Sequence, residues 1–141
     1  MFVMSFKFKG GGWCIDLEDC AARSKTVLGS SNTWTAARYC YDQGGHDGLM
    51  SQDESVNPLM YNWNRIYVGY CDGASLSGKV EEPVQVPNSQ TSVHFKGGYQ
   101  LDAFYDIFIN DYGLATATDI VIGGSSAGGL AVILHLDYIS K

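Results

Sequence analysis

The chain has 141 residues, of which 45% are hydrophobic and 13% aromatic, and its net charge is −6. This length and composition fit one ordinary globular domain with a sizeable core, and they argue against wholesale disorder. The acidic balance argues against nucleic acid or an anionic membrane surface as a partner. No apolar run is long enough to span a membrane.

The chain begins with a regular alternation of apolar side chains. Phe2, Met4, Phe6 and Phe8 recur at every second position, which predicts a strand over residues 1–9. The segment lacks the basic start, the unbroken apolar stretch and the small-residue cleavage site of a secretory signal peptide. A chain that starts inside a strand fits a protein that has lost its beginning.

The middle of the chain predicts short elements separated by loops. Helical stretches are expected at 17–25 and 36–40, and the next clear strand at 65–70. Residues 73–91 carry Gly, Ser, Pro and charge without periodicity, so they are predicted to form a surface loop. The side chains expected on one face of the strand are Ile66, Val68 and Tyr70.

The last third of the chain has the clearest patterns. Residues 97–113 follow helical spacing up to Gly113, which suits a helix stop. The run DIVIG at 119–123 is typical of a fully buried strand. Residues 127–139 are apolar almost all round, so this predicted helix must be covered on most sides. The order of strands and helices predicts an α/β domain with a largely parallel sheet and flanking helices.

A G-x-S-x-G motif at residues 124–128 lies between this strand and this helix. In that context Ser126 is a candidate nucleophile, because a nucleophile elbow holds its serine in a strained conformation at a sharp turn. Small residues at 124 and 128 would keep strand and helix from colliding. The helix N-terminus adds partial positive charge and free N–H groups beside the hydroxyl.

An esterase of this kind also needs donors for the oxyanion of a tetrahedral intermediate. The N–H group of Ala127, directly after the candidate nucleophile, is one candidate. The second should come from a loop after an earlier strand, and GGGW at 10–13 fits, with the N–H groups of Gly12 and Trp13 facing the substrate.

Other interpretations of the glycine-rich turn remain open from the motif alone. Such turns also bind phosphate groups or simply pack tightly. A dinucleotide site is disfavoured because the spacing is not G-x-G-x-x-G and no βαβ continuation follows. The presence of GGGW behind a separate strand favours the hydrolase interpretation.

Four stretches of the sequence resemble the pectin acetylesterase family, which also includes the Notum-type carboxylesterases. They are GGGWC, LGSS, NPLMYNWNRIYVGYCDGAS and GGSSAGGLAVILHLD, in family order, over most of residues 8–137. The forms GGGWC and YCDGAS look like the plant-type enzymes. The resemblance implies an α/β-hydrolase-like fold and a secreted cell-wall serine esterase that removes acetyl groups from pectin or a similar polysaccharide, without metal or cofactor. We expect a monomer.

The resemblance also implies roles for single residues. Ser126 matches the nucleophile, and Gly12, Trp13 and Ala127 match the oxyanion donors. We expect Asp72, within YCDGAS, to lie near the site and contact substrate, with a turn-capping role as the alternative.

The cysteines argue against a zinc site, because no C-x-x-C pair occurs and no histidine falls at zinc-finger spacing. An even number permits disulfides, and four buried free thiols are the alternative. By resemblance, Cys14 and Cys20 match a family disulfide. The pairing of Cys40 and Cys71 stays open.

A catalytic base is the missing part. The family's triad runs Ser, Asp, His, with the last two far downstream, but only His135 follows Ser126 here. At about 1.5 Å per helical residue it sits ~13 Å along the axis from the serine, whereas a base must lie within ~3 Å. Asp137 fails likewise as its orienting acid, so packing in the core explains His135 better.

The other two histidines precede the elbow. We expect His46 in a flexible surface loop and His94 packed in a strand. We therefore expect residues 1–141 to be one partial domain that lacks its C-terminal half, with the triad Asp and His beyond Lys141 and activity impaired in this fragment.

Two competing functions remain. A non-catalytic glycan-binding remnant could stack sugar rings on Trp13, Trp34 or Trp63, although aromatic side chains more often belong to the core. A Notum-like enzyme that removes a fatty acyl group from a protein would need a deep apolar pocket.

Overall fold

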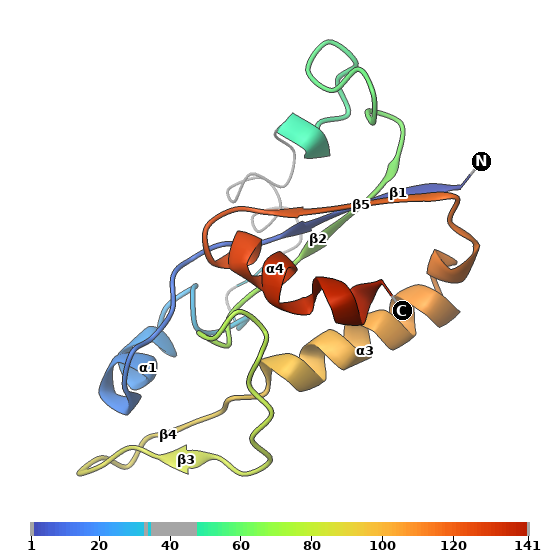
Figure 1. The fold of residues 1–141 in the computed structure, drawn as a ribbon. Helices are drawn as coiled ribbons and strands as arrows, with labels where there is room; N and C mark the ends of the chain where they lie inside the picture. Colours follow the sequence, from blue (N-terminus) through green and yellow to red (C-terminus); the bar gives the residue numbers. More distant parts are fainter. Residues whose placement is uncertain (1, 33, 35–47, 141) are drawn as a thin grey trace.

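The computed structural model describes residues 2–32, 34 and 48–140 of the chain. Its centre is a three-stranded parallel sheet in the order β2-β1-β5 (Figure 1). The strands are β1 (Val3–Phe8), β2 (Asn64–Val68) and β5 (Asp119–Gly124). The predicted α/β architecture with a parallel sheet is therefore confirmed.

The register of the sheet makes all three strands end together. Phe8, the last residue of β1, pairs with Val68 of β2 on one side and with Gly124 of β5 on the other. Parallel strands place their carboxyl ends at the same edge of a sheet, where ligands of open α/β folds bind. The segments that follow the three strands therefore leave the sheet side by side.

Strand β1 is the central strand of the sheet, and both of its faces are covered. Met4, Phe6 and Phe8 point toward the helices and are each at most 7% exposed. On the opposite face Ser5 is buried, and its hydroxyl lies 3.9 Å from the Met50 sulfur. The alternation seen in the sequence thus separates two buried faces rather than an inner and an outer face.

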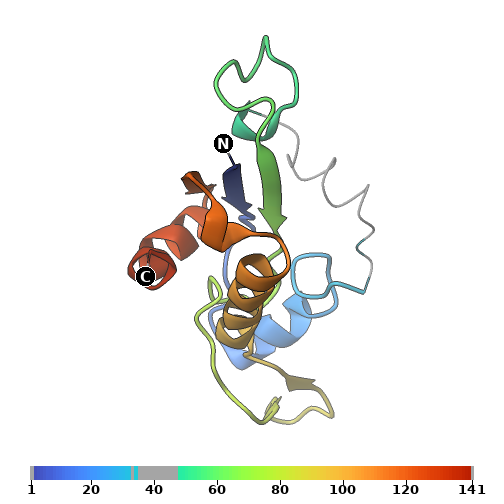
Figure 2. The same ribbon diagram turned by 90° about the vertical axis from the view of Figure 1, so that its right-hand side faces the viewer.

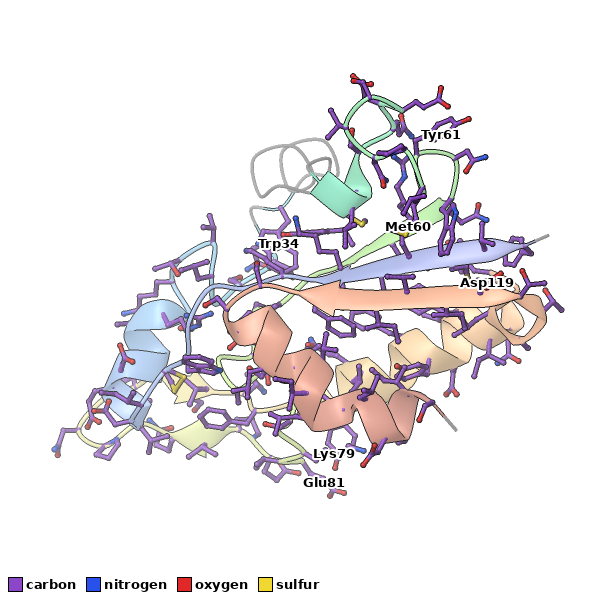
Figure 3. The ribbon with its side chains drawn as sticks, turned by 45° about the horizontal axis from the view of Figure 1, so that its top comes forward. Trp34, Met60, Tyr61, Lys79, Glu81 and Asp119 are labelled. Carbon is purple, nitrogen blue, oxygen red and sulfur yellow. A yellow bond between two sulfur atoms is a disulfide. The ribbon has the colours of Figure 1, made fainter. Side chains whose placement is uncertain are left out.

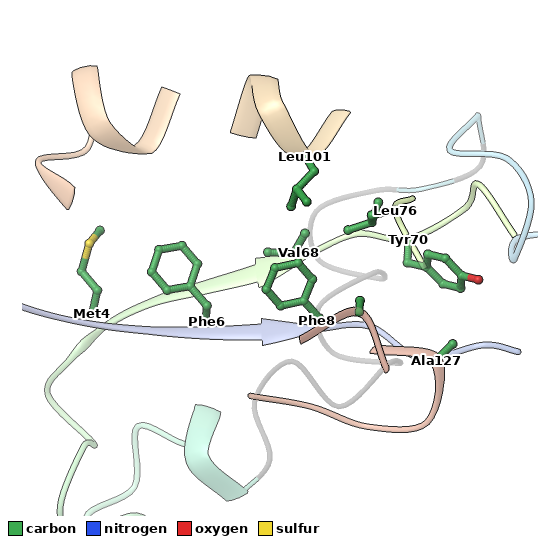
Figure 4. Close-up of a cluster of buried hydrophobic side chains, with 9 residues drawn as sticks. Met4, Phe6, Phe8, Val68, Tyr70, Leu76, Leu101 and Ala127 are labelled. Carbon is green, nitrogen blue, oxygen red and sulfur yellow. The ribbon is translucent and has the colours of Figure 1, made fainter. Parts of the chain in front are cut away.

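Two long helices cover one face of the sheet (Figures 1 and 2). They are α3 (Gly97–Asn110) and α4 (Ala127–Ile139). Leu101 of α3 packs over Phe6 and Phe8 in the main core (Figure 4), and the rings of Phe6 and Phe108 meet edge to face at 5.2 Å. The opposite face carries the 3-10 helix η1 (Gly48–Met50) and the loop with Met60 (Figure 3).

A smaller unit packs beyond the carboxyl end of the sheet. Helix α1 (Leu17–Arg23) is capped at its N-terminus by Asp16, whose side chain accepts a hydrogen bond from the N–H group of Asp19. It packs against a hairpin of β3 (Val84–Gln85) and β4 (Ser92–Val93). A second 3-10 helix, η2 (Leu114–Thr116), joins α3 to β5.

Most elements expected from the sequence occur within one to three residues of their predicted ends. The helix expected at 36–40 lies outside the described residues. The continuation of the helix to residue 113 is wrong by three residues, because α3 ends at Asn110 and Gly113, with φ 73°, caps the start of η2. Within the described ranges, no helix is both long and apolar enough to cross a membrane.

The apolar sequences of β5 and α4 predict cover on most sides, and among the described residues this cover is incomplete. Strand β5 is not fully buried, because it forms one edge of the described sheet and Ile120 is 45% exposed. Helix α4 packs on the sheet with one side only, so much of its apolar surface faces outward. Its exposed large side chains are Leu130, Ile133, Leu134, Leu136 and Tyr138.

The prediction of a surface loop over 73–91 is also wrong at its beginning. Ser75 and Leu76 are each 1% exposed, and both have positive φ angles, 52° and 62°. The loop enters the core beside Tyr70 and Ala127 past the strand ends (Figure 4). Periodicity cannot show this burial, because the segment is neither helix nor strand.

Truncation of Leu76 tests whether this loop belongs to the core. Leu76→Ala should lower the free energy of unfolding by about 2–5 kcal/mol, because it leaves a cavity among buried neighbours. Leu59, which is 83% exposed, provides the control: Leu59→Ala should change the free energy of unfolding by less than about 0.5 kcal/mol. Urea unfolding of both variants makes the comparison, and equal midpoints would contradict the placement of Leu76.

Candidate active site

Ser126 lies in the turn between β5 and α4, and it is the N-cap residue of that helix. Its backbone has φ 54° and ψ −126°, a conformation that non-glycine residues rarely adopt. Such a conformation costs of the order of 1–3 kcal/mol and persists only where the surroundings enforce it. The strained backbone predicted for the elbow is therefore present. Ser126 itself is exposed.

Glycines make this turn possible, because without side chains the backbone of β5 and that of α4 can cross in direct contact. A Cβ atom on Gly124 would overlap the Gly128 carbonyl, and one on Gly128 would overlap the Phe8 carbonyl. A Cβ atom on Gly10 would lie 2.6 Å from the Ser125 carbonyl oxygen. The elbow is thus pressed against the end of β1 through backbone atoms alone.

The predicted oxyanion donors lie at this same edge. Residues 10–13, the glycine-tryptophan segment, follow β1. Gly10 is in contact with Ser126, because a Cβ atom on Gly10 would lie 3.1 Å from the serine Cβ. Ala127 starts α4 with its side chain fully buried. In the described part of the chain, no hydrogen bond engages the backbone N–H groups of Gly12, Trp13 or Ala127.

The carbonyl groups of the glycine segment are held from the opposite side. The Arg23 side chain donates from Nη1 to the Gly11 carbonyl at 2.7 Å. The Tyr70 hydroxyl donates to the Gly12 carbonyl, also at 2.7 Å. Gly11 and Gly12 have φ angles of 139° and 68°, which explains why glycine occupies both positions.

Trp13 has a buried end and an exposed end. Its indole Nε1 donates to the Ser75 hydroxyl at 2.7 Å, while the residue is 47% exposed beside the elbow. Ser75 in turn donates from Oγ to the Ala127 carbonyl at 2.9 Å. One buried hydroxyl therefore links the glycine-tryptophan segment to the first residue of α4.

Sequence reasoning missed Ser75, Arg23 and Tyr70 as parts of this edge. The sequence pattern predicts Tyr70 only on a strand face, Arg23 only within a helical stretch and Ser75 only in a loop. The signal available for Ser75 was its place in YCDGAS, a stretch already singled out for the resemblance. Nothing in the sequence alone shows that the three side chains meet.

Asp72 caps the turn that brings Ser75 into the core. Its Oδ1 accepts a hydrogen bond from the Leu76 N–H group at 3.1 Å, while Oδ2 has no hydrogen-bond partner among the described residues. Burial raises the pKa of the Asp72 carboxyl, and the hydrogen bonds and the Arg23 charge offset only part of this effect. The turn-capping role is thus present in the structure.

The described histidines do not provide a base beside the serine. His135 points its Nε2 to the Ser75 carbonyl oxygen at 2.9 Å and is half-buried, as a packed histidine should be. His94 is exposed and directly follows β4, so its placement in a packed strand is wrong. His46 lies outside the described residues. No group of three metal-ligating side chains occurs in the described ranges.

The four cysteines separate into two cases. Cys14 and Cys20 form a disulfide that ties the glycine-tryptophan segment to α1. Cys71 is half-buried, and burial raises the pKa of its thiol. Cys40 lies outside the described residues, so the pairing of these two stays open.

An apolar cavity of about 300 Å³ lies between the sheet and the helices. Its lining includes Ile120, near the start of β5, and Ile139, at the end of α4. The lining also includes Phe8, which pairs with Gly124, so the cavity runs along the sheet toward the end that carries the elbow, although no residue of the elbow itself lines it.

A family model described as pectinacetylesterase matches residues 3–141. The chain belongs to the pectin acetylesterase family. Pectin acetylesterase 5 of Arabidopsis thaliana is 38% identical over 130 residues, which cover 92% of this chain and 28% of the plant protein. Palmitoleoyl-protein carboxylesterase NOTUM of Drosophila melanogaster is 32% identical over 133 residues, 92% of this chain and 19% of the relative.

Structural comparison places this pectin acetylesterase family chain within a larger α/β-hydrolase-like fold. The structure of the Wnt deacylase Notum from Drosophila matches with a TM-score of 0.80 and 29% identity. The match covers 98% of this chain and 38% of the Notum chain. The family consists of carboxylic ester hydrolases, and the chain spans between about a fifth and two fifths of the relatives named here.

Gly128→Ala tests the close crossing of strand and helix. The added methyl group would overlap the Phe8 and Lys9 carbonyls, so it should cost about 1–3 kcal/mol of stability by overpacking. Gly123→Ala is the control, because its methyl group would meet only the Phe6 carbonyl at 4.0 Å. Thermal unfolding distinguishes them, and an unchanged Tm for the first variant would contradict the crossing.

The Asp72 carboxyl gives a pH-dependent prediction. Its raised pKa means that the folded protein binds this proton more tightly than the unfolded chain, so the ionised carboxylate lowers stability at neutral pH. Asp72→Asn should therefore raise Tm near pH 7, and the gain should shrink as pH falls through the raised pKa. Asp106→Asn, at an exposed position of α3, is the control. A gain that grows at acidic pH would refute this account.

Proposed function

We propose that the protein is a serine carboxylesterase that hydrolyses acetyl esters of pectin or a similar cell-wall polysaccharide. The observation that carries the proposal is the strained Ser126, pressed at the carboxyl edge of the sheet against the glycine segment that follows β1. Family membership supports the class of reaction, and the plant relatives support the substrate.

In the proposed reaction the Ser126 hydroxyl attacks the carbonyl carbon of the acetyl ester and loses its proton to a base. The resulting oxyanion accepts hydrogen bonds from the N–H groups of Gly12, Trp13 and Ala127, which the described fold leaves unengaged. The intermediate then collapses, the sugar oxygen leaves with the proton that the base took from the serine, and the resulting acetyl-serine is hydrolysed by water. No metal or cofactor takes part.

We assign the base and its orienting acid to a His and an Asp that follow Lys141 in the full-length protein. This assignment rests on the share of the relatives that the chain spans and on the absence of a suitable histidine among the described residues. Without its base, a triad enzyme keeps a residual acceleration of only ~10³–10⁴ over water. Residues 1–141 alone should therefore be a poor catalyst.

The surroundings of the serine fit a sugar-bound ester. Trp13 presents a half-exposed indole ring next to the elbow, and such rings provide flat apolar surface with one polar end. In the proposed complex this ring supports the sugar that carries the acetyl group. The Cys14–Cys20 disulfide agrees with a secreted, cell-wall location.

A Notum-like activity on a fatty acyl group is less well supported by this part of the protein. It needs a deep apolar pocket that opens beside the nucleophile, and none of residues 124–128 lines the apolar cavity. A glycan-binding remnant would use the same Trp13 surface without hydrolysis, and experiment must separate it from the esterase.

Labelling of the full-length protein with a fluorophosphonate probe tests the nucleophile. The unsubstituted protein should become labelled and release acetate from acetylated pectin, and Ser126→Ala should abolish labelling and lower kcat by at least about 10³-fold. Ser125→Ala, in the neighbouring position of the turn, is the matched control and should still be labelled.

The same experiment distinguishes the alternatives. Equal labelling of Ser126→Ala and the unsubstituted protein would refute the nucleophile. Absence of labelling together with retained polysaccharide binding would support the glycan-binding remnant instead.

A further inference from the structure

Two side chains hold the backs of the peptide units that carry the proposed oxyanion donors. Arg23 binds the carbonyl oxygen of Gly11 and Tyr70 binds that of Gly12, each at 2.7 Å. The N–H groups of these same two peptide units belong to Gly12 and Trp13. This inference deepens the proposed esterase function and rests on it.

A trans peptide unit is planar, and its N–H and C=O groups point in opposite directions. Fixing the carbonyl of one residue therefore fixes the direction of the N–H group of the next. The Arg23 bond to Gly11 sets the direction of the Gly12 N–H group, and the Tyr70 bond to Gly12 sets that of Trp13. Both carbonyls are drawn into the protein, so both N–H groups point the opposite way.

The segment needs this support because its own residues provide little. Gly11 and Gly12 have no side chains and adopt φ angles of 139° and 68°, so local sterics leave their peptide planes free to rotate. Donors that act on a developing oxyanion must already point at it, because reorientation during the reaction would cost free energy. Tertiary contacts must therefore hold the two planes.

Arg23 and Tyr70 form one packed unit with the loop that follows β2. The Arg23 guanidinium lies 5.4 Å from the centroid of the Tyr70 ring, and Tyr70 is only 2% exposed. The Ser75 N–H group donates to the Tyr70 hydroxyl at 3.3 Å, and the Ser75 hydroxyl donates to the Ala127 carbonyl. The unit thus reaches the residue that carries the third proposed donor.

We infer that Arg23 and Tyr70 are positioning residues, which orient the Gly12 and Trp13 N–H groups toward the substrate oxyanion by binding the carbonyl oxygens of Gly11 and Gly12. Neither side chain touches the substrate in this arrangement. Their effect on the reaction passes through the two peptide planes.

Tyr70→Phe is the sharpest test, because it removes one hydroxyl and keeps the buried ring. In the full-length protein kcat for acetyl ester hydrolysis should fall by about 10-fold, less than the 10²–10³-fold typical for loss of a direct oxyanion donor. KM should stay within about twofold, because the oxyanion exists only after attack. Rates are expressed per active site, counted with the fluorophosphonate, so that partial unfolding does not imitate the effect.

Tyr138→Phe is the matched control. Its hydroxyl also donates a hydrogen bond, to Asp102 Oδ1 at 2.9 Å, but it lies near the end of α4, away from the elbow. This variant should keep the kcat of the unsubstituted protein. Arg23→Lys, which keeps the charge but loses the planar fork, is a second test variant and should lower kcat in the same way.

A second measurement separates positioning from a loss of stability. A small boronic acid that adds to the serine oxygen gives a tetrahedral anion, so its inhibition constant should rise in Tyr70→Phe in parallel with the fall in kcat/KM. A variant that is merely less stable would lose active sites but would keep the inhibition constant of those that remain.

Each outcome decides between the two proposals. If the unsubstituted protein is labelled and active, but Tyr70→Phe and Arg23→Lys keep its kcat and boronate affinity, the positioning role is wrong and the esterase stands. If Tyr70→Phe does not fold, Arg23→Lys decides by the same criteria. If the unsubstituted protein is neither labelled nor active, the proposed esterase fails and the positioning role fails with it.

Discussion

The backbone contact between the end of β1 and the turn into α4 is the constraint on which the edge of this sheet depends. The register ends β1, β2 and β5 at one level, and glycines at 10, 124 and 128 let the crossing chains meet without side chains between them. This contact holds Ser126 in a conformation that it would not adopt alone. It also places the segment after β1 directly beside the serine.

A second level of support comes from buried hydrogen bonds behind this edge. Arg23, Tyr70 and Ser75 belong to a helix, to the residues just after a strand and to a loop, yet all three bind backbone carbonyls at the same place. Glycine-rich backbone is easily deformed, so a site built from it depends on such contacts. The loop after β2 supplies the Ser75 contact, and it does so with positive φ angles at Ser75 and Leu76.

The described fold is open on one side, where β5 forms an edge and α4 exposes a row of large apolar side chains. The match covers 38% of the Notum chain, so most of that chain lies outside the matched part. Exposed apolar surface and a strand edge of this kind are covered in stable proteins.

The sequence by itself determined the order of the elements, the parallel sheet, the elbow at Ser126 and the family, because periodicity and short motifs are local. It predicted Tyr70 on the same face of a strand as Ile66 and Val68, but it could not assign a partner to the hydroxyl. Only the tertiary structure decided that residues 75 and 76 are buried, that His94 is exposed, and that Arg23 and Tyr70 meet behind Gly11 and Gly12. Such contacts join residues up to about sixty positions apart, and they exist only once the strands have paired and the segments that follow them lie side by side.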